Sequence, residues 1–324
     1  MLNRFVNKTA VITGAASGLG KEIARRGQTL GMNLVLVDSN LAKLQDFTQE
    51  LRDTAVSKDK ILSLTADVSS FKDIEHVGRE TKSKFGVPNY IFNNAGISRA
   101  GFAWEHTTEE WNWFLGVNLM GVVNGIRVFT PMMLDAAKAD PNFRGRVINT
   151  ASMAGLVSMP LASMYNVSKH AVVTLSETLY HDLKFLTDQV SASVLCPFFV
   201  PTNISSVPVL PPHVTDSYTA EDGTVRGKTP SQAIGEAGAT KAVVSGKISA
   251  EQVATIVFDA IDKDQFYIYS HPQLLGTFMD RANDVASITN PRDFYGSKPD
   301  VGDKLKIALQ KAYGFQAQAK TPKE

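Results

Sequence analysis

The sequence has a single cysteine, Cys196, among 324 residues. One thiol cannot form a disulfide within the chain, nor a CxxC metal or redox site. The six histidines are scattered, without the HExxH spacing of a zinc peptidase. We therefore expect no metal centre. The scarcity of cysteine fits a reducing compartment, and the predicted location is the cytoplasm.

An excess of charge of either sign is also absent, because 33 Lys and Arg face 32 Asp and Glu. This balance predicts neither a nucleic-acid nor an anionic membrane partner. Residues 1–8 lack the apolar segment of a secretory signal. The longest apolar stretch, 114–134, contains Asn118, Asn124 and Arg127, which are costly in lipid, so we predict a core helix. A small-molecule partner is the expectation that remains.

With 44% hydrophobic residues the chain has enough apolar side chains for a folded core. Short β-branched runs alternate with longer segments of helical period over residues 1–200. Predicted strands are 9–13, 33–38, 61–66, 90–93, 146–151 and 192–196. Predicted helices are 20–30, 41–51, 71–84, 108–137 and 161–186. The alternation predicts an α/β fold, a doubly wound parallel sheet of the Rossmann kind.

Two segments fall outside this alternation. Residues 203–247 contain a Pro-rich run and show no sustained period, and long loops of this type are often functional. A helix at 249–261 and a strand at 266–269 follow, and 276–324 has a helical stretch near 305–312 before a polar tail. Without these two segments the length suits one doubly wound domain. We expect one domain over 1–275, with 203–247 as a substrate lid, and a C-terminal extension over 276–324.

The first predicted strand runs into the glycine-rich stretch from Thr13 to Gly20, directly before a helix. Such glycines let backbone N–H groups approach a pyrophosphate at the positive end of the helix dipole. Asp38 ends the second strand, about 20 residues further on, where an acidic side chain accepts hydrogen bonds from a ribose. Taken singly, an ordinary turn and a helix N-cap at Asp38 are alternative interpretations. Together the two features predict dinucleotide binding.

Asp38 also bears on the choice of dinucleotide. A carboxylate beside the ribose repels a 2′-phosphate, and neither Ser17 nor Ser39 supplies a basic side chain. The sequence therefore favours NAD over NADP.

At this point the chain resembles the short-chain dehydrogenase/reductase family, in several motifs that occur in the family's order over about residues 8–202. The glycine motif TGxxxGxG matches Thr13, Gly14, Gly18 and Gly20. The family's Asp-Val pair, its NNAG motif and its catalytic Asn, Ser, Tyr and Lys fall on Asp67, Val68, Asn93, Asn94, Ala95, Gly96, Asn118, Ser152, Tyr165 and Lys169. The resemblance implies that the cofactor contacts Gly14, Ser17, Gly18, Leu19, Gly20, Asp38, Asp67, Val68, Asn94, Ala95, Gly96, Tyr165, Lys169, Val200 and Thr202.

Part of the chemistry can be argued from the residues themselves. Tyr165 and Lys169 are four residues apart on a predicted helix, so they share a face. A nearby ammonium lowers the pKa of a phenol, which suits Tyr165 to general acid and base catalysis. Ser152 ends the fifth strand and can donate to a carbonyl oxygen. The resemblance adds that Lys169 binds the nicotinamide ribose and that Asn118 holds a water connecting Lys169 to solvent.

One residue departs from the family pattern, because Phe198 follows Pro197 where the family usually has glycine. Phe198 and Phe199 have two interpretations, as walls of a substrate pocket or as core packing. The other expected pocket residues are mostly apolar: Met153, Ala154, Met159, Val207, Val209, Leu210 and Tyr218. They favour a bulky hydrophobic or aromatic secondary alcohol and its ketone.

The sequence is compatible with other functions as well. A 3-hydroxyacyl-thioester dehydrogenase or ketoacyl reductase would share every catalytic residue. A non-catalytic NAD sensor would need the glycine turn and Asp38, but neither Tyr165 nor Lys169. The resemblance also implies a homodimer or homotetramer formed through the two long predicted helices.

Overall fold

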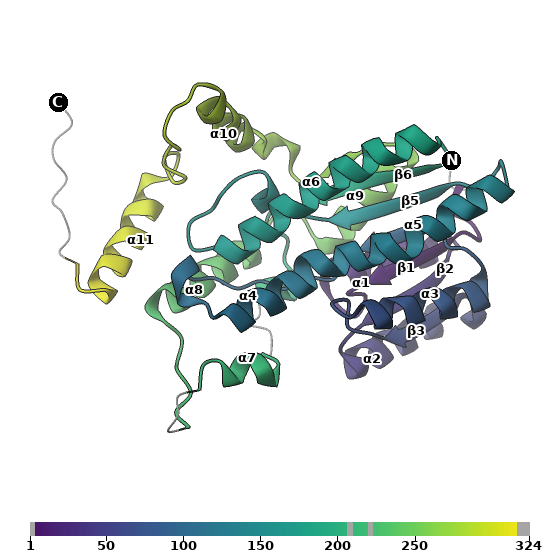
Figure 1. Ribbon diagram of the computed structural model, residues 1–324, viewed down its shortest axis with the longest axis horizontal. Helices are drawn as coiled ribbons and strands as arrows, with labels where there is room; N and C mark the ends of the chain where they lie inside the picture. The colour runs from purple at the N-terminus through teal and green to yellow at the C-terminus, as the bar shows by residue number, and fades with distance from the viewer. Residues whose placement is uncertain (1–3, 206–209, 220–222, 316–324) are drawn as a thin grey trace.

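The computed structural model describes residues 4–205, 210–219 and 223–315. These residues form a seven-stranded sheet in the order β3-β2-β1-β4-β5-β6-β7, and every neighbouring pair is parallel (Figure 1). The strands are β1 (Thr9–Thr13), β2 (Asn33–Asp38), β3 (Ile61–Thr65), β4 (Tyr90–Asn93), β5 (Gly145–Thr150), β6 (Val190–Cys196) and β7 (Tyr267–Tyr269). The strand order reverses between β1 and β4, where doubly wound sheets bind ligands. The predicted fold class is confirmed.

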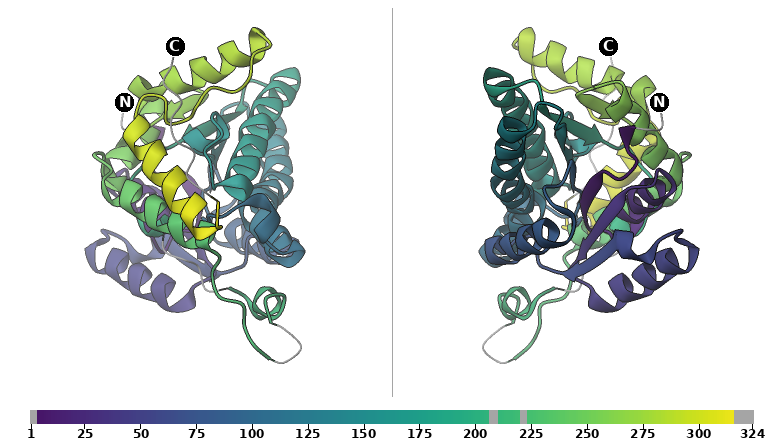
Figure 2. Two further views of the ribbon diagram at one scale, coloured as in Figure 1. Left: turned by 90° about the vertical axis from the view of Figure 1, so that its left-hand side faces the viewer. Right: turned by 90° about the vertical axis from the view of Figure 1, so that its right-hand side faces the viewer.

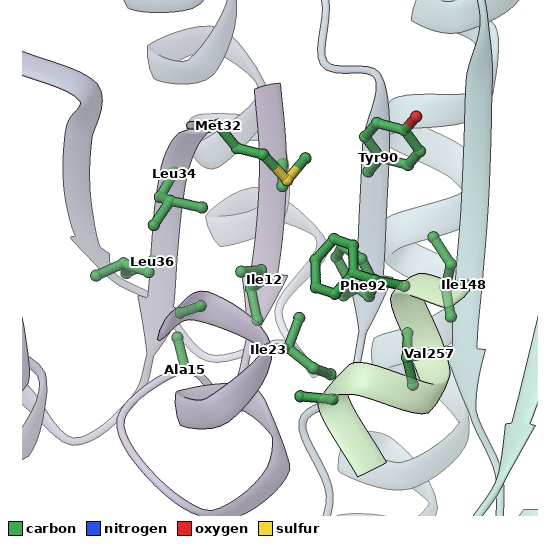
Figure 3. Packing of buried hydrophobic residues seen from close by; sticks show 14 of the residues in the cluster. Ile12, Ala15, Ile23, Met32, Leu34, Leu36, Tyr90, Phe92, Ile148 and Val257 are labelled. Atoms are coloured by element: carbon green, nitrogen blue, oxygen red, sulfur yellow. The ribbon is translucent and has the colours of Figure 1, made fainter. Parts of the chain in front are cut away.

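Helices cover both faces of the sheet, as the two side views in Figure 2 show. One face carries α1 (Gly18–Thr29), α2 (Leu41–Thr54) and α9 (Ala250–Asp262), and the other carries α3 (Phe71–Phe85), α5 (Gly121–Ala139) and α6 (Ser163–Leu186). The strands are apolar on both sides for this reason: Ile12 packs with Ile23 and Val257 in one core (Figure 3), while its neighbour Val11 packs with Phe129 in the other.

The long helix expected over 108–137 is interrupted. It consists of α4 (Thr108–Leu115), a π-helical turn, η4 (Gly116–Met120), and then α5. Asn118 lies in that turn, where its Oδ1 accepts from the N–H of Ile97 at 2.8 Å and its Nδ2 donates to the Ile97 carbonyl at 2.9 Å. A π-turn inside an α-helix is often found at a functional site.

Among the described residues, the stretch Thr108–Ala139 alone has the length and composition of a membrane-crossing helix. It packs the fully buried side chains of Phe129 and Met133 against the sheet. Its place in the fold is that of the core helix expected from the sequence.

The expectation that 203–247 lacks regular structure is wrong over the residues that the structure describes. The short helix α7 (Pro212–Asp216) and the longer α8 (Pro230–Val244) lie here. A capping box begins α8, in which the Thr229 hydroxyl accepts from the N–H of Gln232 and the Gln232 side chain accepts from the N–H of Thr229. Val207 and Val209, two of the expected pocket residues, lie outside the described residues.

The extension contains two helices, α10 (Gly276–Ala286) and α11 (Pro299–Ala312), the second of which begins earlier than the stretch expected near 305. Helix α11 packs against α8. Just after α11, the Tyr313 hydroxyl accepts from the N–H of Ser231 at 3.1 Å and donates to the carboxylate of Glu105. The described residues also contain short 3-10 helices, among them η2 (Lys58–Lys60), η3 (Ala103–Glu105), η5 (Met153–Gly155), η6 (Asn203–Ser205) and η7 (Pro272–Leu274).

Candidate active site

The glycine-rich turn lies between β1 and the N-terminus of α1. Gly14 and Gly18 have φ angles of +65° and +52°, in the left-handed region that favours glycine. A Cβ on Gly20 would come 2.2 Å from the carbonyl oxygen of Gly14. Ser17 precedes the first turn of α1 in an extended conformation. The turn thus forms a cradle of bare backbone at the positive end of a helix, which suits a pyrophosphate.

Asp38 lies beside this turn. Its Oδ2 accepts from the N–H of Ala16 at 3.0 Å, and its Oδ1 accepts from the N–H of Asn40 at 2.9 Å. The N-cap of α2 is Asn40, whose side chain accepts from the N–H of Lys43. The alternative interpretation of Asp38 as that N-cap is therefore wrong, and its carboxylate is next to the dinucleotide turn.

The NNAG motif follows β4 and packs against the same turn. Thr13 Oγ1 accepts from the N–H groups of Asn94 and Ala95 at 2.9 and 3.1 Å, and Asn94 Nδ2 donates to the Thr13 carbonyl at 3.1 Å. A Cβ on Gly14 would come 2.9 Å from the Cα of Ala95. The two motifs, far apart in the sequence, form one surface at the switch point of the sheet.

The Asp67-Val68 pair follows β3. The exposed Asp67 uses Oδ1 to accept from both the N–H and the hydroxyl of Ser69. Val68 is buried, and a Cβ on Gly121 would come 2.8 Å from it. The carboxyl end of β3 therefore places Asp67 at the solvent side of the sheet edge and Val68 beneath it.

Gly96, Asn118 and Lys169 come together near the middle of the sheet's carboxyl edge. A Cβ on Gly96 would lie 3.3 Å from Asn118 Oδ1 and 3.6 Å from Lys169 Nζ. Lys169 is buried and donates from Nζ to the carbonyl of Thr150, the last residue of β5, at 2.9 Å. The side chain of Asn118 in the π-turn, the backbone of Gly96 in the NNAG motif and the side chain of Lys169 in α6 thus lie close together.

Tyr165 and Ser152 lie beside that group. Lys169 Nζ is 5.7 Å from the centroid of the Tyr165 ring, as expected for residues four apart on a helix. Ser152 follows β5, where its Oγ accepts from the N–H of Ala154 at 3.1 Å and donates to the Pro197 carbonyl at 3.4 Å. A hydrogen bond with Ser152 also acts on the Tyr165 phenol, so the two hydroxyl groups are neighbours.

The spacing of Tyr165 and Lys169 predicts a lowered pKa for the Tyr165 phenol, whereas its surroundings in the structure favour a raised one. Burial raises the pKa of the phenol above its ordinary value, and the hydrogen bond with Ser152 only partly opposes this. Burial also lowers the pKa of Lys169 to about 8. Desolvation disfavours the charged form of each group and is the largest cause of both shifts.

The segment after β6 returns to the glycine turn. A Cβ on Gly18 would come 3.3 Å from the Cβ of Thr202. Val200 is buried in the core cluster against which Leu19 packs. The segment after β6 thus lies next to the glycine turn through Thr202, Val200 and Leu19. The family resemblance implies cofactor contacts for these three residues.

Phe198 and Phe199 have ring centroids 4.4 Å apart, and Phe198 packs against the core cluster that includes Met153 and Cys196. Met153 and Ala154 are almost fully buried, so packing accounts for both. Burial raises the pKa of the Cys196 thiol to about 12, which agrees with a packing role for this residue.

A group of residues that the sequence did not single out lies at the start of α4. The buried carboxylate of Glu110 accepts from Arg99 Nε at 2.7 Å, contacts His106 Nδ1 at 2.7 Å, and accepts from the hydroxyl of Tyr218. Glu105 accepts from Thr229, Ser231 and Tyr313 in the same way. These two carboxylates connect the body of the domain to 203–247 and to the extension.

Helix α8 also approaches the site directly. A Cβ on Gly235 would come 2.7 Å from the Cβ of Ala100 and 3.4 Å from that of Leu161, a residue that precedes α6 with a positive φ of 61°. The Phe102 N–H donates to Ser231 Oγ at 2.9 Å. The close packing places α8 next to the start of the helix that carries Tyr165.

Comparisons with known proteins agree with this geometry. Residues 8–207 match the family model described as short chain dehydrogenase. The chain is 30% identical over 288 residues to the "CLA biosynthesis dehydrogenase/reductase" of Lactiplantibacillus plantarum, covering 87% of this chain and 94% of that protein. It is 32% identical over 203 residues to the meso-2,3-butanediol dehydrogenase of Serratia marcescens, covering 63% and 75% of the two chains.

A solved structure is also similar. The short chain dehydrogenase/reductase of Burkholderia phymatum in complex with NAD is 40% identical, with a TM-score of 0.80 and coverage of 89% of this chain and 98% of that one. The matched motifs, the switch-point site and these relatives lead to one conclusion. The chain belongs to the short-chain dehydrogenase/reductase family of oxidoreductases.

Proposed function

We propose that the protein is an NAD-dependent dehydrogenase that interconverts a bulky, hydrophobic or aromatic secondary alcohol and its ketone. The observation that carries this proposal is the convergence of Gly96, Asn118 and Lys169 beside Tyr165 and Ser152, next to the glycine turn. Four chemically different side chains meet at the switch point of the sheet, where this fold binds its ligands.

The cradle fits a dinucleotide. We assign the pyrophosphate to the turn from Gly14 to Gly20, the adenosine ribose to Asp38, and the nicotinamide end to Lys169 and Thr202. A bound nicotinamide would supply the hydride acceptor or donor. The Asp38 carboxylate favours NAD, and the NAD complex of the Burkholderia phymatum relative supports the same choice.

The protein's own residues would handle the proton and the oxygen. Tyr165 takes the hydroxyl proton of the alcohol, or returns it to the ketone, as a general base and acid. Ser152 donates a hydrogen bond to the substrate oxygen as negative charge develops there. Lys169 stabilises the phenolate when its own ammonium is charged, and Asn118 keeps the π-turn joined to Ile97.

We assign substrate choice to residues 203–247, because α8 in this segment packs over Ala100 and Leu161. An exchange of 203–247 for a short loop tests this assignment. The exchange should change the substrate range and spare NADH affinity, whereas loss of NADH binding by a folded variant would contradict the assignment.

We also propose a homo-oligomer formed through α5 and α6. Exposed apolar side chains on or beside these helices support it, with Met120 42%, Val167 51% and Phe185 88% exposed. A monomer mass by light scattering at micromolar concentration would contradict this part.

The direct test of the reaction is a panel of alcohols with NAD and of ketones with NADH, followed by NADH absorbance. The panel includes 1-phenylethanol and acetophenone, 2,3-butanediol, and a 3-hydroxyacyl thioester. The proposal predicts the highest kcat/KM with the aryl pair. Preference for the thioester would favour a hydroxyacyl-thioester dehydrogenase, and NADH binding without turnover of any compound would favour a sensor.

A further inference from the structure

The peptide bond between Pro197 and Phe198 follows β6 at the position where the family usually has glycine. Its carbonyl oxygen accepts from the N–H of Met153 at 2.9 Å and from the hydroxyl of Ser152 at 3.4 Å. Its N–H, contributed by Phe198, donates to Ser270 Oγ at 3.0 Å. The carbonyl side of this peptide group is therefore held by the Met153 N–H and lies next to the proposed catalytic serine, while its N–H side is held by Ser270.

Ser270 in turn contacts His271, with 2.7 Å between Oγ and Nδ1. Both side chains are buried, with 2% and 7% exposed. Burial lowers the pKa of His271, which leaves a neutral ring able to accept the Ser270 hydrogen. The His271 ring also meets the Phe198 ring edge-on at 5.6 Å between centroids. Phe198, absent from the usual family pattern, thus has its backbone N–H bound by Ser270 and its ring packed against His271.

The Ser152 hydroxyl has one hydrogen and two neighbours that can receive it. The Pro197 carbonyl is one, and the Tyr165 phenol is the other. The position of the Pro197 oxygen therefore decides where that hydrogen points before a substrate oxygen arrives. Small displacements of such a group matter, because a hydrogen bond weakens steeply with poor geometry.

We propose that Ser270 and His271 are positioning residues that orient the Ser152 hydroxyl through the Pro197–Phe198 peptide. The inference rests on the proposed function, because it assigns Ser152 to the substrate oxygen. Neither residue touches the reacting atoms. They act by holding a peptide group whose carbonyl oxygen sets the direction of the Ser152 hydrogen.

The first test is one substitution made in two backgrounds, wild type and Ser152→Ala. Ser270→Ala should lower kcat for 1-phenylethanol about tenfold, as loss of one buried hydrogen bond implies. NADH affinity should stay within about twofold, because Val200 and Thr202 keep their own contacts beside the turn. In a Ser152→Ala background the same substitution should have no further effect on kcat. An equal loss in both backgrounds, or no loss in either, would overturn the proposal.

Two substitutions at His271 separate the ring from its nitrogen. His271→Asn keeps a polar atom near the position of Nδ1, and His271→Phe keeps an aromatic ring against Phe198. The proposal predicts that His271→Asn retains most of the kcat and that His271→Phe loses as much as Ser270→Ala. The reverse order would contradict it. Ser287→Ala, an exposed serine in the extension, is the matched control and should leave kcat unchanged.

A second test of the positioning role does not depend on catalytic turnover, so its outcome can be distinguished from failure of the proposed function. If the wild-type protein turns over no compound of the panel, the proposed function fails. Amide hydrogen exchange at Phe198 and Met153 then decides whether the peptide is held as inferred. Ser270→Ala should speed exchange at both amides at least about fivefold beyond the increase that its loss of global stability produces, and exchange unchanged after that correction would overturn the positioning role.

Discussion

Lys169 donates a hydrogen bond from Nζ to the backbone carbonyl of Thr150, 2.9 Å away, and this contact holds a buried amine at the end of β5. The same burial lowers the pKa of Lys169 to about 8. The unfolded chain keeps the proton up to its ordinary pKa near 10.5, so it binds more protons than the folded protein between these values. Stability contributed by this group should therefore rise with pH across that window.

The effect of Lys169 can be isolated by subtracting the free energy of unfolding of the Lys169→Met variant from that of wild type. This difference should rise by about 3 kcal/mol from pH 7 to pH 10.5. Urea denaturation at several pH values measures it. Lys138→Met, at an exposed position on α5, is the control and should give no such rise. A flat difference for Lys169→Met would mean that the amine titrates normally.

Glu110 should control stability at acid pH. Hydrogen bonds from His106 and Tyr218 and the charge of Arg99 outweigh burial and lower the pKa of Glu110 to about 2. Its contribution is therefore complete above pH 4.5 and is lost as pH falls toward 2. Glu110→Gln should cost about 1–3 kcal/mol at pH 7, because the buried Arg99 is left with Glu236, at 3.3 Å, as its carboxylate partner.

Chemical denaturation between pH 7 and pH 2.5 checks this prediction. The Glu110→Gln variant should depend less on pH below 4.5 than wild type does, because only the share from other carboxyl groups with lowered pKa values, such as Glu105 and Asp264, remains. The neighbouring Glu109 is exposed, so Glu109→Gln should behave like wild type. Equal effects of the two substitutions would show that the buried cluster does not stabilise the fold.

Gly20 should not tolerate a side chain. Its Cβ would lie 2.2 Å from the carbonyl oxygen of Gly14, and backbone cannot move away there without opening the turn. Gly20→Ala should weaken NADH binding at least about tenfold and lower the Tm. Gly238→Ala, in α8 with open space around its Cα, should leave NADH binding unchanged. Fluorescence titration with NADH measures the affinity of both variants. Normal NADH affinity of Gly20→Ala would contradict the assignment of the glycine turn to the dinucleotide.

Cofactor preference should follow Asp38. Replacing Asp38 by Ser and Ser39 by Arg removes the carboxylate and adds a cation for a 2′-phosphate. The ratio of kcat/KM for NADP over NAD should rise at least about 100-fold in this double variant. An unchanged ratio in steady-state kinetics would remove Asp38 from its assigned role.

The parts of the site that sequence could predict are those that sit at the carboxyl ends of strands. The ends of β1, β2, β4 and β5 place Gly14, Asp38, Asn94 and Ser152 at one edge of the sheet, whatever the loops do. The spacing of Tyr165 and Lys169 predicts that they share a helix face. The directions of their pKa shifts cannot be predicted from spacing, because they depend on how deeply the fold buries each side chain.

Helix α8 was missed because it has small residues around its circumference and no clear apolar stripe. The stretch Thr229 to Gln232, a capping box with proline at the first helical position, was the available signal. The contacts of Glu105 with Thr229 and Tyr313, and that of Glu110 with Tyr218, join residues more than a hundred positions apart. No local pattern encodes such pairs, so their partners appeared only in the folded chain.

The most direct test of the proposed reaction is the turnover of Tyr165→Phe, with Tyr180→Phe on the same helix as control. We predict that Tyr165→Phe lowers kcat for the best alcohol of the panel at least about 100-fold while its NADH affinity stays within about twofold. Tyr180→Phe should keep the wild-type kcat. Near wild-type turnover of a folded, NADH-binding Tyr165→Phe variant would contradict the role of Tyr165 as general acid and base.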